Sequence, residues 1–172
     1  MKSDPDKIYI VRGNHDFSTR PRYIAGLIAE LGAHLLDGRP VYWEKNGAQI
    51  CIAGLEAPYS PGDPAAVILD KLPEAGFRIL LTHTPDNFPL AARKGWDWVL
   101  AGHTHGGQSR LPWIGPILVP SVHGRRFAYG IHRIDQSILT VTAGIGAQMP
   151  FRLFTPPEMV VYTLHRKPQS GD

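Results

Sequence analysis

The sequence contains a single cysteine, Cys51, in 172 residues, so no disulfide can form within the chain. This cysteine stands in the apolar run 48–53 and is expected to be a buried strand residue. No apolar run approaches the roughly 20 residues that a helix needs to cross a bilayer. The first seven residues are polar and lack the apolar stretch of a signal peptide. These absences exclude a fold held by internal disulfides and predict that no helix crosses a membrane. They are compatible with a protein that works in a reducing compartment.

An excess of charge of one sign is also missing. Lys and Arg together number 18, Asp and Glu number 15, and the formal net charge is +3. This bias is too weak to indicate a nucleic acid partner, and no basic stripe is interleaved with aromatic residues. Internal repeats and low-complexity tracts are absent too, whereas hydrophobic residues make up 43% of the sequence, enough for a core at this length. We therefore expect one globular domain and no nucleic acid partner.

Strand-like apolar runs alternate with helical patterns early in the chain and follow one another late in it. Helices are expected at about 21–31, 64–72 and 87–94. Strands are expected at 7–11, 41–44, 49–53, 78–82, 96–101, 127–131, 137–141 and 159–164, with a hairpin turn at Asn46-Gly47. This order favours an α/β fold, a mixed β-sheet sandwich flanked by helices.

Polar residues with metal-binding chemistry follow three of the expected strands. GNHD at 13–16 follows the first strand, His83 follows the strand at 78–82, and His103 and His105 follow the strand at 96–101. Ligand sites of open α/β sheets lie beyond the carboxyl ends of the strands, so these groups are expected at one edge. Imidazole and amide oxygen both bind divalent metals. If His103 and His105 lie in extended chain, their rings share a face, because residues two apart point the same way.

Each motif taken alone has an ordinary structural explanation. GNHD can be a turn, since Asn, Gly and Asp favour turns. His83 can be a surface or capping residue, and two histidines at this spacing arise often by chance. Their occurrence at three strand ends makes chance a much weaker explanation, and a metal site is the better interpretation.

The order GNHD, an isolated His after an apolar strand, and GHTHGGQ resembles the calcineurin-like metallophosphoesterase superfamily. The segments LLTHTPD, LAGHTHGGQSRLP and PFRLFTPPEMVVYTL resemble a bacterial branch of membrane-associated phosphoesterases related to UDP-2,3-diacylglucosamine pyrophosphatase of lipid A synthesis. The likeness runs from about Lys7 to Leu164. It implies a sandwich of the α/β/β/α type and hydrolysis of a phosphoester or pyrophosphate bond by a hydroxide that bridges two metal ions.

The resemblance also implies a ligand set and a cofactor. Asn14, His83 and His103 would bind the second metal, and His105 would bind the first. Two divalent ions are implied, Mn²⁺ foremost, with Fe²⁺, Zn²⁺ or Mg²⁺ as alternatives.

Two catalytic roles follow from the same resemblance. His15 would stabilise developing charge or protonate the leaving oxygen, and Asp16 would hold the turn or orient His15. The implied substrate is a small phosphorylated, nucleotide-sugar or lipid-linked phosphate. The implied location is the cytoplasm or the inner face of a bacterial membrane.

Two family motifs are missing from their expected place upstream of GNHD. The sequence contains no Asp-x-His, and Gly62-Asp63 lies downstream instead. We therefore expect residues 1–172 to be the C-terminal portion of a metallophosphoesterase domain that lacks the first βαβ portion. Four of the family's seven metal-binding side chains remain, without the bridging carboxylate. Because the remaining donors are neutral, two dications would repel each other without compensation, and one ion is expected.

The segment after the last histidines is apolar and rich in proline. Residues 111–120 either pack under the core or contact a lipid chain or membrane surface. Arg125 and Arg126 follow, and guanidinium groups suit phosphate. Trp113, Arg125 and Arg126 are therefore candidate substrate-binding residues. Two other functions stay open: a catalytically inactive metal-binding or interaction fragment, and a nuclease or cyclic-nucleotide phosphodiesterase of the same superfamily.

Overall fold

The structure is a computed structural model that describes residues 8–18, 21–36, 38, 40–45, 47–56, 67–70, 73–147 and 151–165. The helices are α1 (Asn14–Ser18), α2 (Pro21–Glu30), α3 (Val67–Asp70) and α4 (Phe88–Arg93), with 3-10 turns at Pro85–Asn87, His105–Gly107 and Gly124–Phe127. The strands are β1 (Tyr9–Ile10), β2 (His34–Leu35), β3 (Val41–Lys45), β4 (Ala48–Leu55), β5 (Phe77–Thr82), β6 (Trp98–Ala101), β7 (Arg110–Leu111), β8 (Gly115–Pro116), β9 (Gly130–Ile134) and β10 (Ser137–Val141). Among these residues, no helix is long and apolar enough to cross a membrane.

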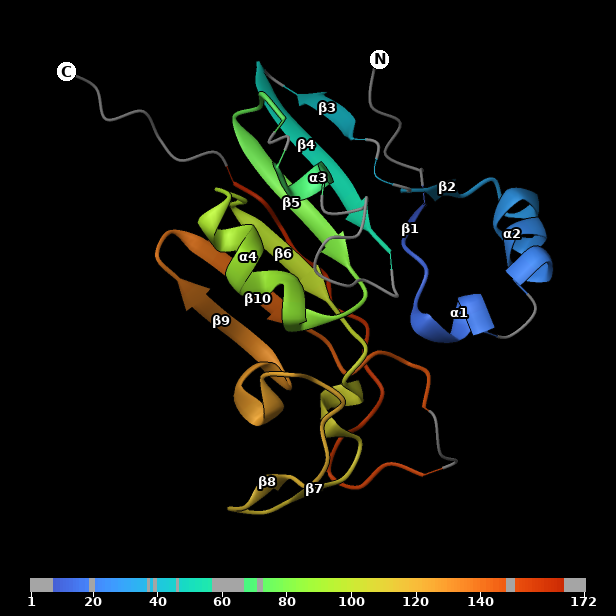
Figure 1. Ribbon diagram of the computed structural model, residues 1–172, viewed down its shortest axis with the longest axis vertical. Coiled ribbons are helices and arrows are strands. Elements are labelled where there is room, and N and C mark those ends of the chain that lie inside the picture. Colours follow the sequence, from blue (N-terminus) through green and yellow to red (C-terminus); the bar gives the residue numbers. More distant parts are fainter. Residues whose placement is uncertain are drawn as a thin grey trace.

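Six strands form one mixed sheet in the order β3-β4-β5-β6-β10-β9 (Figure 1). The four central strands are parallel, while β3 and β9 pair antiparallel at the two edges. Central parallel strands are covered on both faces, which explains why β5 and β6 read as continuous apolar runs. The α/β class and the β3–β4 hairpin are confirmed. The described residues form one large sheet, whereas the sequence led us to expect two stacked sheets.

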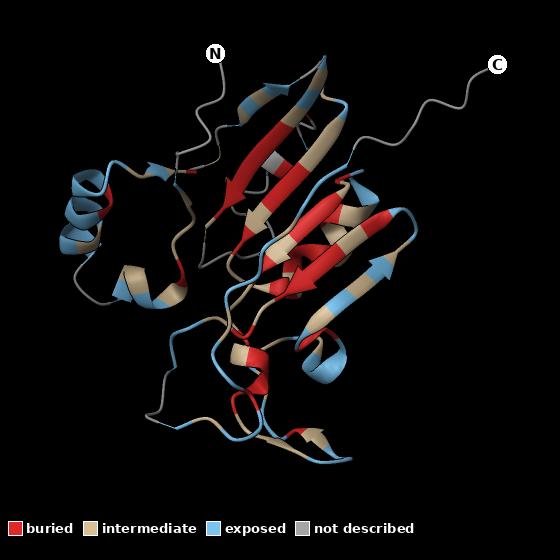
Figure 2. Ribbon diagram, turned by 180° about the vertical axis from the view of Figure 1, so that it is seen from behind, coloured by how far each residue is buried: buried red, intermediate tan, exposed pale blue. Residues whose placement is uncertain are grey.

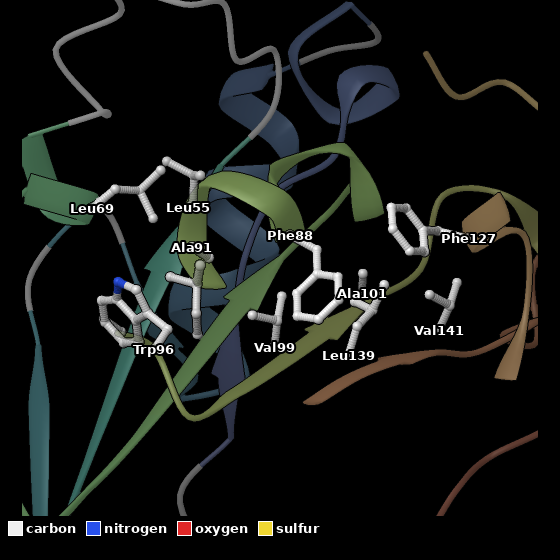
Figure 3. Close-up of a cluster of buried hydrophobic side chains, with 12 residues drawn as sticks. Leu55, Leu69, Phe88, Ala91, Trp96, Val99, Ala101, Phe127, Leu139 and Val141 are labelled. Atoms are coloured by element: carbon white, nitrogen blue, oxygen red, sulfur yellow. The ribbon is translucent and has the colours of Figure 1, made fainter. Parts of the chain in front are cut away.

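One face of this sheet carries the main hydrophobic core (Figure 3). Alternate residues of the central strands point to it, and α4 covers them with Phe88, which is fully buried. Phe88 meets Phe127 edge to face, with ring centroids 5.6 Å apart. Trp96, also fully buried, packs in the same cluster. This packing fixes the ends of β5 and β6, from which the histidines project.

The opposite face is covered more thinly by the described chain (Figure 2). Four side chains of its cluster are buried, Leu36, Ile52, Ile79 and Trp98, and the others are half-buried. Tyr162 of the C-terminal segment meets Trp98 edge to face, at 4.7 Å between centroids. The segment β1–β2, with α1 and α2, lies beside β4 on this side of the molecule (Figure 1).

Three expected strands differ from the structure. Residues 159–164 form no strand; Tyr162 holds this segment to the sheet through ring packing, without backbone pairing. The strand expected at 127–131 begins at Gly130 instead, because Phe127 ends a 3-10 turn and is buried in the main core. The strand expected at 7–11 is reduced to two half-buried residues that pair with β2 outside the main sheet. Gly62-Asp63, and residues 64–66 and 71–72 of an expected helix, lie outside the described residues.

Gly54 in β4 is the point of closest approach between the main sheet and the β1–β2 segment. A Cβ at this position would lie 2.3 Å from Cβ of Leu36 and 2.7 Å from Cγ1 of Val11. We predict that Gly54→Ala lowers the free energy of unfolding by about 1–3 kcal/mol through overpacking, as measured by urea denaturation. Gly26→Ala is the matched control, because a Cβ there, in helix α2, meets nothing within 4 Å. An unchanged urea midpoint for Gly54→Ala would contradict this packing.

Candidate metal centre

The histidines project from the carboxyl ends of two neighbouring parallel strands. The register of β5 and β6 pairs Thr82 with Ala101, so His83 and Gly102 are the next residues along each strand. The amide of Gly102 donates to the carbonyl of His83 at 3.1 Å, which continues the pairing one step beyond the sheet. The expectation that strand ends deliver these side chains to one edge therefore holds for His83 and His103.

Asn14 and His103, which come from two other segments of the chain, both contact His83. Nε2–H of His83 donates to Oδ1 of Asn14 at 2.8 Å. The rings of His83 and His103 lie with centroids 4.6 Å apart. A Cβ at position 13 would lie 2.6–2.9 Å from the His83 ring, so Gly13 is required for this approach. Three of the four predicted metal-binding residues are thus brought together.

The GNHD segment forms a short turn that opens α1. The carboxylate of Asp16 accepts a hydrogen bond from the amide of Gly13 at 2.7 Å, and the amide of Asp16 donates to the carbonyl of Gly13 at 3.1 Å. These two hydrogen bonds fit the first of the two roles expected for Asp16, which is to hold the turn. His15 is exposed and follows Asn14 directly at the start of α1, which places it beside the cluster.

The His103-Thr104-His105 segment is a tight turn, so the argument from alternating faces in extended chain is wrong. His103 and His105 both have left-handed backbones, with φ of 66° and 51°. His105 opens a 3-10 turn, and its Nδ1 donates to the carbonyl of Gly146 at 3.1 Å. The structure therefore brings His105 near the other imidazoles without placing its ring in contact with them.

Asp86 is a neighbour of the cluster that sequence reasoning missed. Its carboxylate accepts hydrogen bonds from the hydroxyl of Ser121 at 2.5 Å and from the amide of Val122 at 3.3 Å. Burial lowers the pKa of His103, and the carboxylate of Asp86 and the carbonyl of Pro120 both act to raise it against this stronger effect. Asp86 thus ties the 120–122 segment down beside His103. A signal was present, since Asp86 closes the LLTHTPD string that begins at Leu80.

His83, His103 and His105 are held in the neutral form that metal binding needs. Burial, reinforced by the charge of His103, lowers the pKa of His83 to about 4. Burial is also the main cause of the lowered pKa of His103 and of His105. Because a protonated imidazole cannot bind a metal, these shifts keep the ring nitrogens available at neutral pH.

The His83 shift predicts a loss of stability on acidification. The unfolded chain binds a proton at this ring near pH 6.5 and the folded chain only near pH 4, so protons favour unfolding between these values. The contribution of His83 to the free energy of unfolding is fully present above pH 6.5 and is lost as the pH falls to about 4. The loss is at most about 3 kcal/mol, and it is smaller because the ring is partly exposed to water. Urea unfolding in chelator at several pH values measures this loss. His83→Gln should reduce the dependence on pH, and an identical dependence in that variant would contradict the assignment.

The donor set suits one divalent ion better than two. Among the residues that the structure describes, no three His, Cys, Asp or Glu side chains lie close enough together to hold a metal. The cluster instead combines the amide of Asn14 with the imidazoles of His83 and His103, all neutral donors. The Asp16 carboxylate accepts from a backbone amide, and that of Asp86 from an amide and a hydroxyl.

The candidate substrate-binding residues lie at the surface. Trp113 is fully exposed at the turn between β7 and β8. Arg125 donates to the carbonyl of Ile114 at 3.1 Å, and the guanidinium of Arg126 lies 5.0 Å from the centre of the Phe127 ring. Their role in substrate binding stays a prediction.

Comparison with known proteins shows which family the chain resembles. The model of the calcineurin-like phosphoesterase family matches residues 1–107. The uncharacterized metallophosphoesterase YkuE of Bacillus subtilis is 31% identical over 161 residues, covering 90% of this chain and 54% of its own. The phosphodiesterase YaeI of Escherichia coli is 34% identical over 87 residues, or 51% of this chain and 32% of its own.

A more distant relative is the UDP-2,3-diacylglucosamine pyrophosphatase LpxG of Chlamydia muridarum, 30% identical over 92 residues, or 48% of this chain and 27% of its own. No solved structure matches the chain. The chain spans about half the length of YkuE and about a third of that of YaeI. The family match covers GNHD, His83, His103 and His105, the residues that the sequence analysis singled out. The chain belongs to the calcineurin-like phosphoesterase family.

Proposed function

We propose that this chain is part of a metal-dependent hydrolase that cleaves a phosphoester or pyrophosphate bond. Family membership implies phosphoester hydrolysis at the general level. The observation that supports the site is the contact of Asn14, His83 and His103, which come from three separate segments. Neutral imidazoles gathered beside an amide oxygen have no better chemical use than binding a divalent cation.

Each residue of the cluster has a role in this proposal. Asn14, His83 and His103 hold one divalent ion, and His105 contributes to a second after leaving the carbonyl of Gly146. Divalent metals in such sites lower the pKa of water and neutralise charge on the phosphoryl oxygens. His15, exposed at the start of α1, donates a proton to the leaving oxygen.

The finer parts of the proposal concern the metal, the substrate and the complete domain. Mn²⁺ is the leading ion, with Fe²⁺, Zn²⁺ and Mg²⁺ as alternatives. The match to LpxG, whose name gives a lipid-bearing nucleotide sugar as its substrate, supports a lipid-linked or nucleotide-sugar phosphate here. The two-sheet sandwich with helices on both sides stays part of this proposal, since the second face of the present sheet is thinly covered.

Residues 1–172 and a longer polypeptide, assayed side by side, separate the hydrolase from a metal-binding module. The donors that the described residues gather are neutral, so the charge of two adjacent ions would be uncompensated. We predict that residues 1–172 bind at most one Mn²⁺ or Zn²⁺ and hydrolyse bis-p-nitrophenyl phosphate no faster than buffer with the same metal. Elemental analysis and the release of p-nitrophenol measure both quantities.

The control for this experiment is any longer polypeptide that the gene encodes, assayed with the same metal. Turnover by that polypeptide, lost in chelator, supports the hydrolase. A long form that binds metal without turnover on any phosphoester supports the inactive module. Robust turnover by residues 1–172 with two bound ions would show that the ligand set has been misjudged and that other carboxylates complete the site.

A further inference from the structure

The hairpin that follows the metal cluster exposes a run of large apolar side chains. The apolar tip, as we name it, consists of Trp113, Ile114, Ile117 and Leu118, with exposed fractions of 103%, 60%, 55% and 79%. Of the two alternatives left by the sequence, packing under the core is therefore wrong for these four residues. Fully burying a side chain of this size is worth about 1.5–3 kcal/mol, so the tip has a strong tendency to leave water.

The apolar tip belongs to a structured loop. β7 and β8 pair antiparallel on either side of the turn that carries Trp113. The amide of Ile117 donates to the carbonyl of Ser109 at 3.0 Å, and Arg125 donates to the carbonyl of Ile114 at 3.1 Å. Figure 1 shows the hairpin projecting at one end of the molecule, beyond the turns that carry the histidines. An ordered backbone thus holds the side chains of the apolar tip at the surface.

The surroundings of the apolar tip are cationic. Residues 109–132 contain no Asp or Glu, and they carry three arginines: Arg110, Arg125 and Arg126. Among the described residues, two carboxylates from other segments reach this part of the surface, and both accept hydrogen bonds from neutral groups. Asp86 accepts hydrogen bonds from Ser121 and Val122, and Glu158 accepts from Tyr129 and Ala143. The three arginines outnumber these two carboxylates, and an apolar surface rimmed by guanidinium groups matches an anionic lipid interface.

We propose that the apolar tip inserts into the surface of an anionic lipid bilayer, with Arg125 and Arg126 meeting the headgroups. A second copy of the chain is a poorer occupant, because a symmetric contact would bring the same arginines of both copies together. β7 begins at Arg110, shortly after the 3-10 turn His105–Gly107, so a membrane-bound tip holds this turn close to the lipid surface. Membrane binding does not itself require hydrolysis, and only its use in delivering a substrate rests on the proposed function.

Vesicle binding by the full protein, without metal or substrate, tests this proposal. We expect sedimentation with vesicles of phosphatidylcholine and phosphatidylglycerol and weak binding to pure phosphatidylcholine. Trp113 is a built-in reporter, since Trp96 and Trp98 are buried and Trp43 is half-buried. Brominated acyl chains should quench Trp113 fluorescence. The double variant Trp113→Ser, Ile114→Ser should bind anionic vesicles at least tenfold more weakly, and Arg126→Gln should weaken binding at low salt.

Ile131→Ser is the matched control, because Ile131 is 68% exposed on β9, in another part of the surface, and should bind as the parent does. Absence of vesicle binding, or equal weakening by Ile131→Ser, overturns the proposal. Concentration-dependent dimers that the double variant abolishes, without vesicle binding, would assign the apolar tip to self-association instead. Turnover on a soluble ester is measured separately, so loss of hydrolysis and loss of membrane binding are distinguishable.

Discussion

Replacing His103 by alanine in the catalytically competent protein should abolish metal-dependent hydrolysis and lower the metal content. The ring centroid of His103 lies 4.6 Å from that of His83. Removing the imidazole leaves Asn14 and His83, a pair of neutral donors that already satisfy each other by a 2.8 Å hydrogen bond. Two such donors hold a divalent ion poorly, so both the ion and its chemistry are lost.

Elemental analysis and initial rates on bis-p-nitrophenyl phosphate measure this result together. His165→Ala is the control, because His165 is exposed and lies outside the cluster. It should retain both metal and rate. A His103→Ala protein that turns over at the parental rate with its full complement of metal would remove the metal centre as assigned. Thermal unfolding in chelator separates loss of metal from loss of fold.

The parts of the site that the sequence predicted are those that depend on strand ends. The apolar runs at 78–82 and 96–101 predicted two strands that end beside His83 and His103, and the structure has β5 and β6 there. Asn14 was predicted from its motif, although the strand before it is shorter and less buried than expected.

The prediction that was wrong concerned the His103-Thr104-His105 segment, whose backbone conformations a periodic pattern does not describe. His103 and His105 take left-handed φ values next to glycines, so their spacing of two gave no common face. The ring of His105 is turned to Gly146, a contact across 41 residues that no local pattern indicates. Asp86 was missed because its partners, Ser121 and Val122, lie in a loop whose path only the folded chain defines.

Residues 111–120 show another limit of prediction from the sequence. Hydrophobicity alone made burial the ordinary expectation for residues 111–120, and Pro116 is indeed buried. The hairpin turn at Trp113 nevertheless carries the larger side chains out into water. Whether an apolar residue is core or contact surface depends on which side of a tight turn it occupies, and that is a property of tertiary structure.

Replacing His15 by alanine should lower the rate by about 10²–10⁴-fold, the usual contribution of general acid catalysis. His15 follows Asn14 directly at the start of α1, is exposed, and lies within electrostatic reach of His83, His103 and His105. It can thus protonate a leaving oxygen beside the metal donors without being needed to hold the ion. Metal content should therefore stay at the parental level.

The leaving group decides whether His15 acts as the acid. An alkoxide needs a proton as it departs, whereas p-nitrophenolate is stable without one, so the loss caused by His15→Ala should be large for alkyl phosphodiesters and small for nitrophenyl esters. Added imidazole should restore part of the rate on the alkyl substrate, because it can occupy the space left by the ring. His34→Ala controls for removal of a surface imidazole, since His34 is exposed and its ring packs on Tyr9. An equal loss on good and poor leaving groups, with no rescue by imidazole, would assign His15 to charge stabilisation instead of proton transfer.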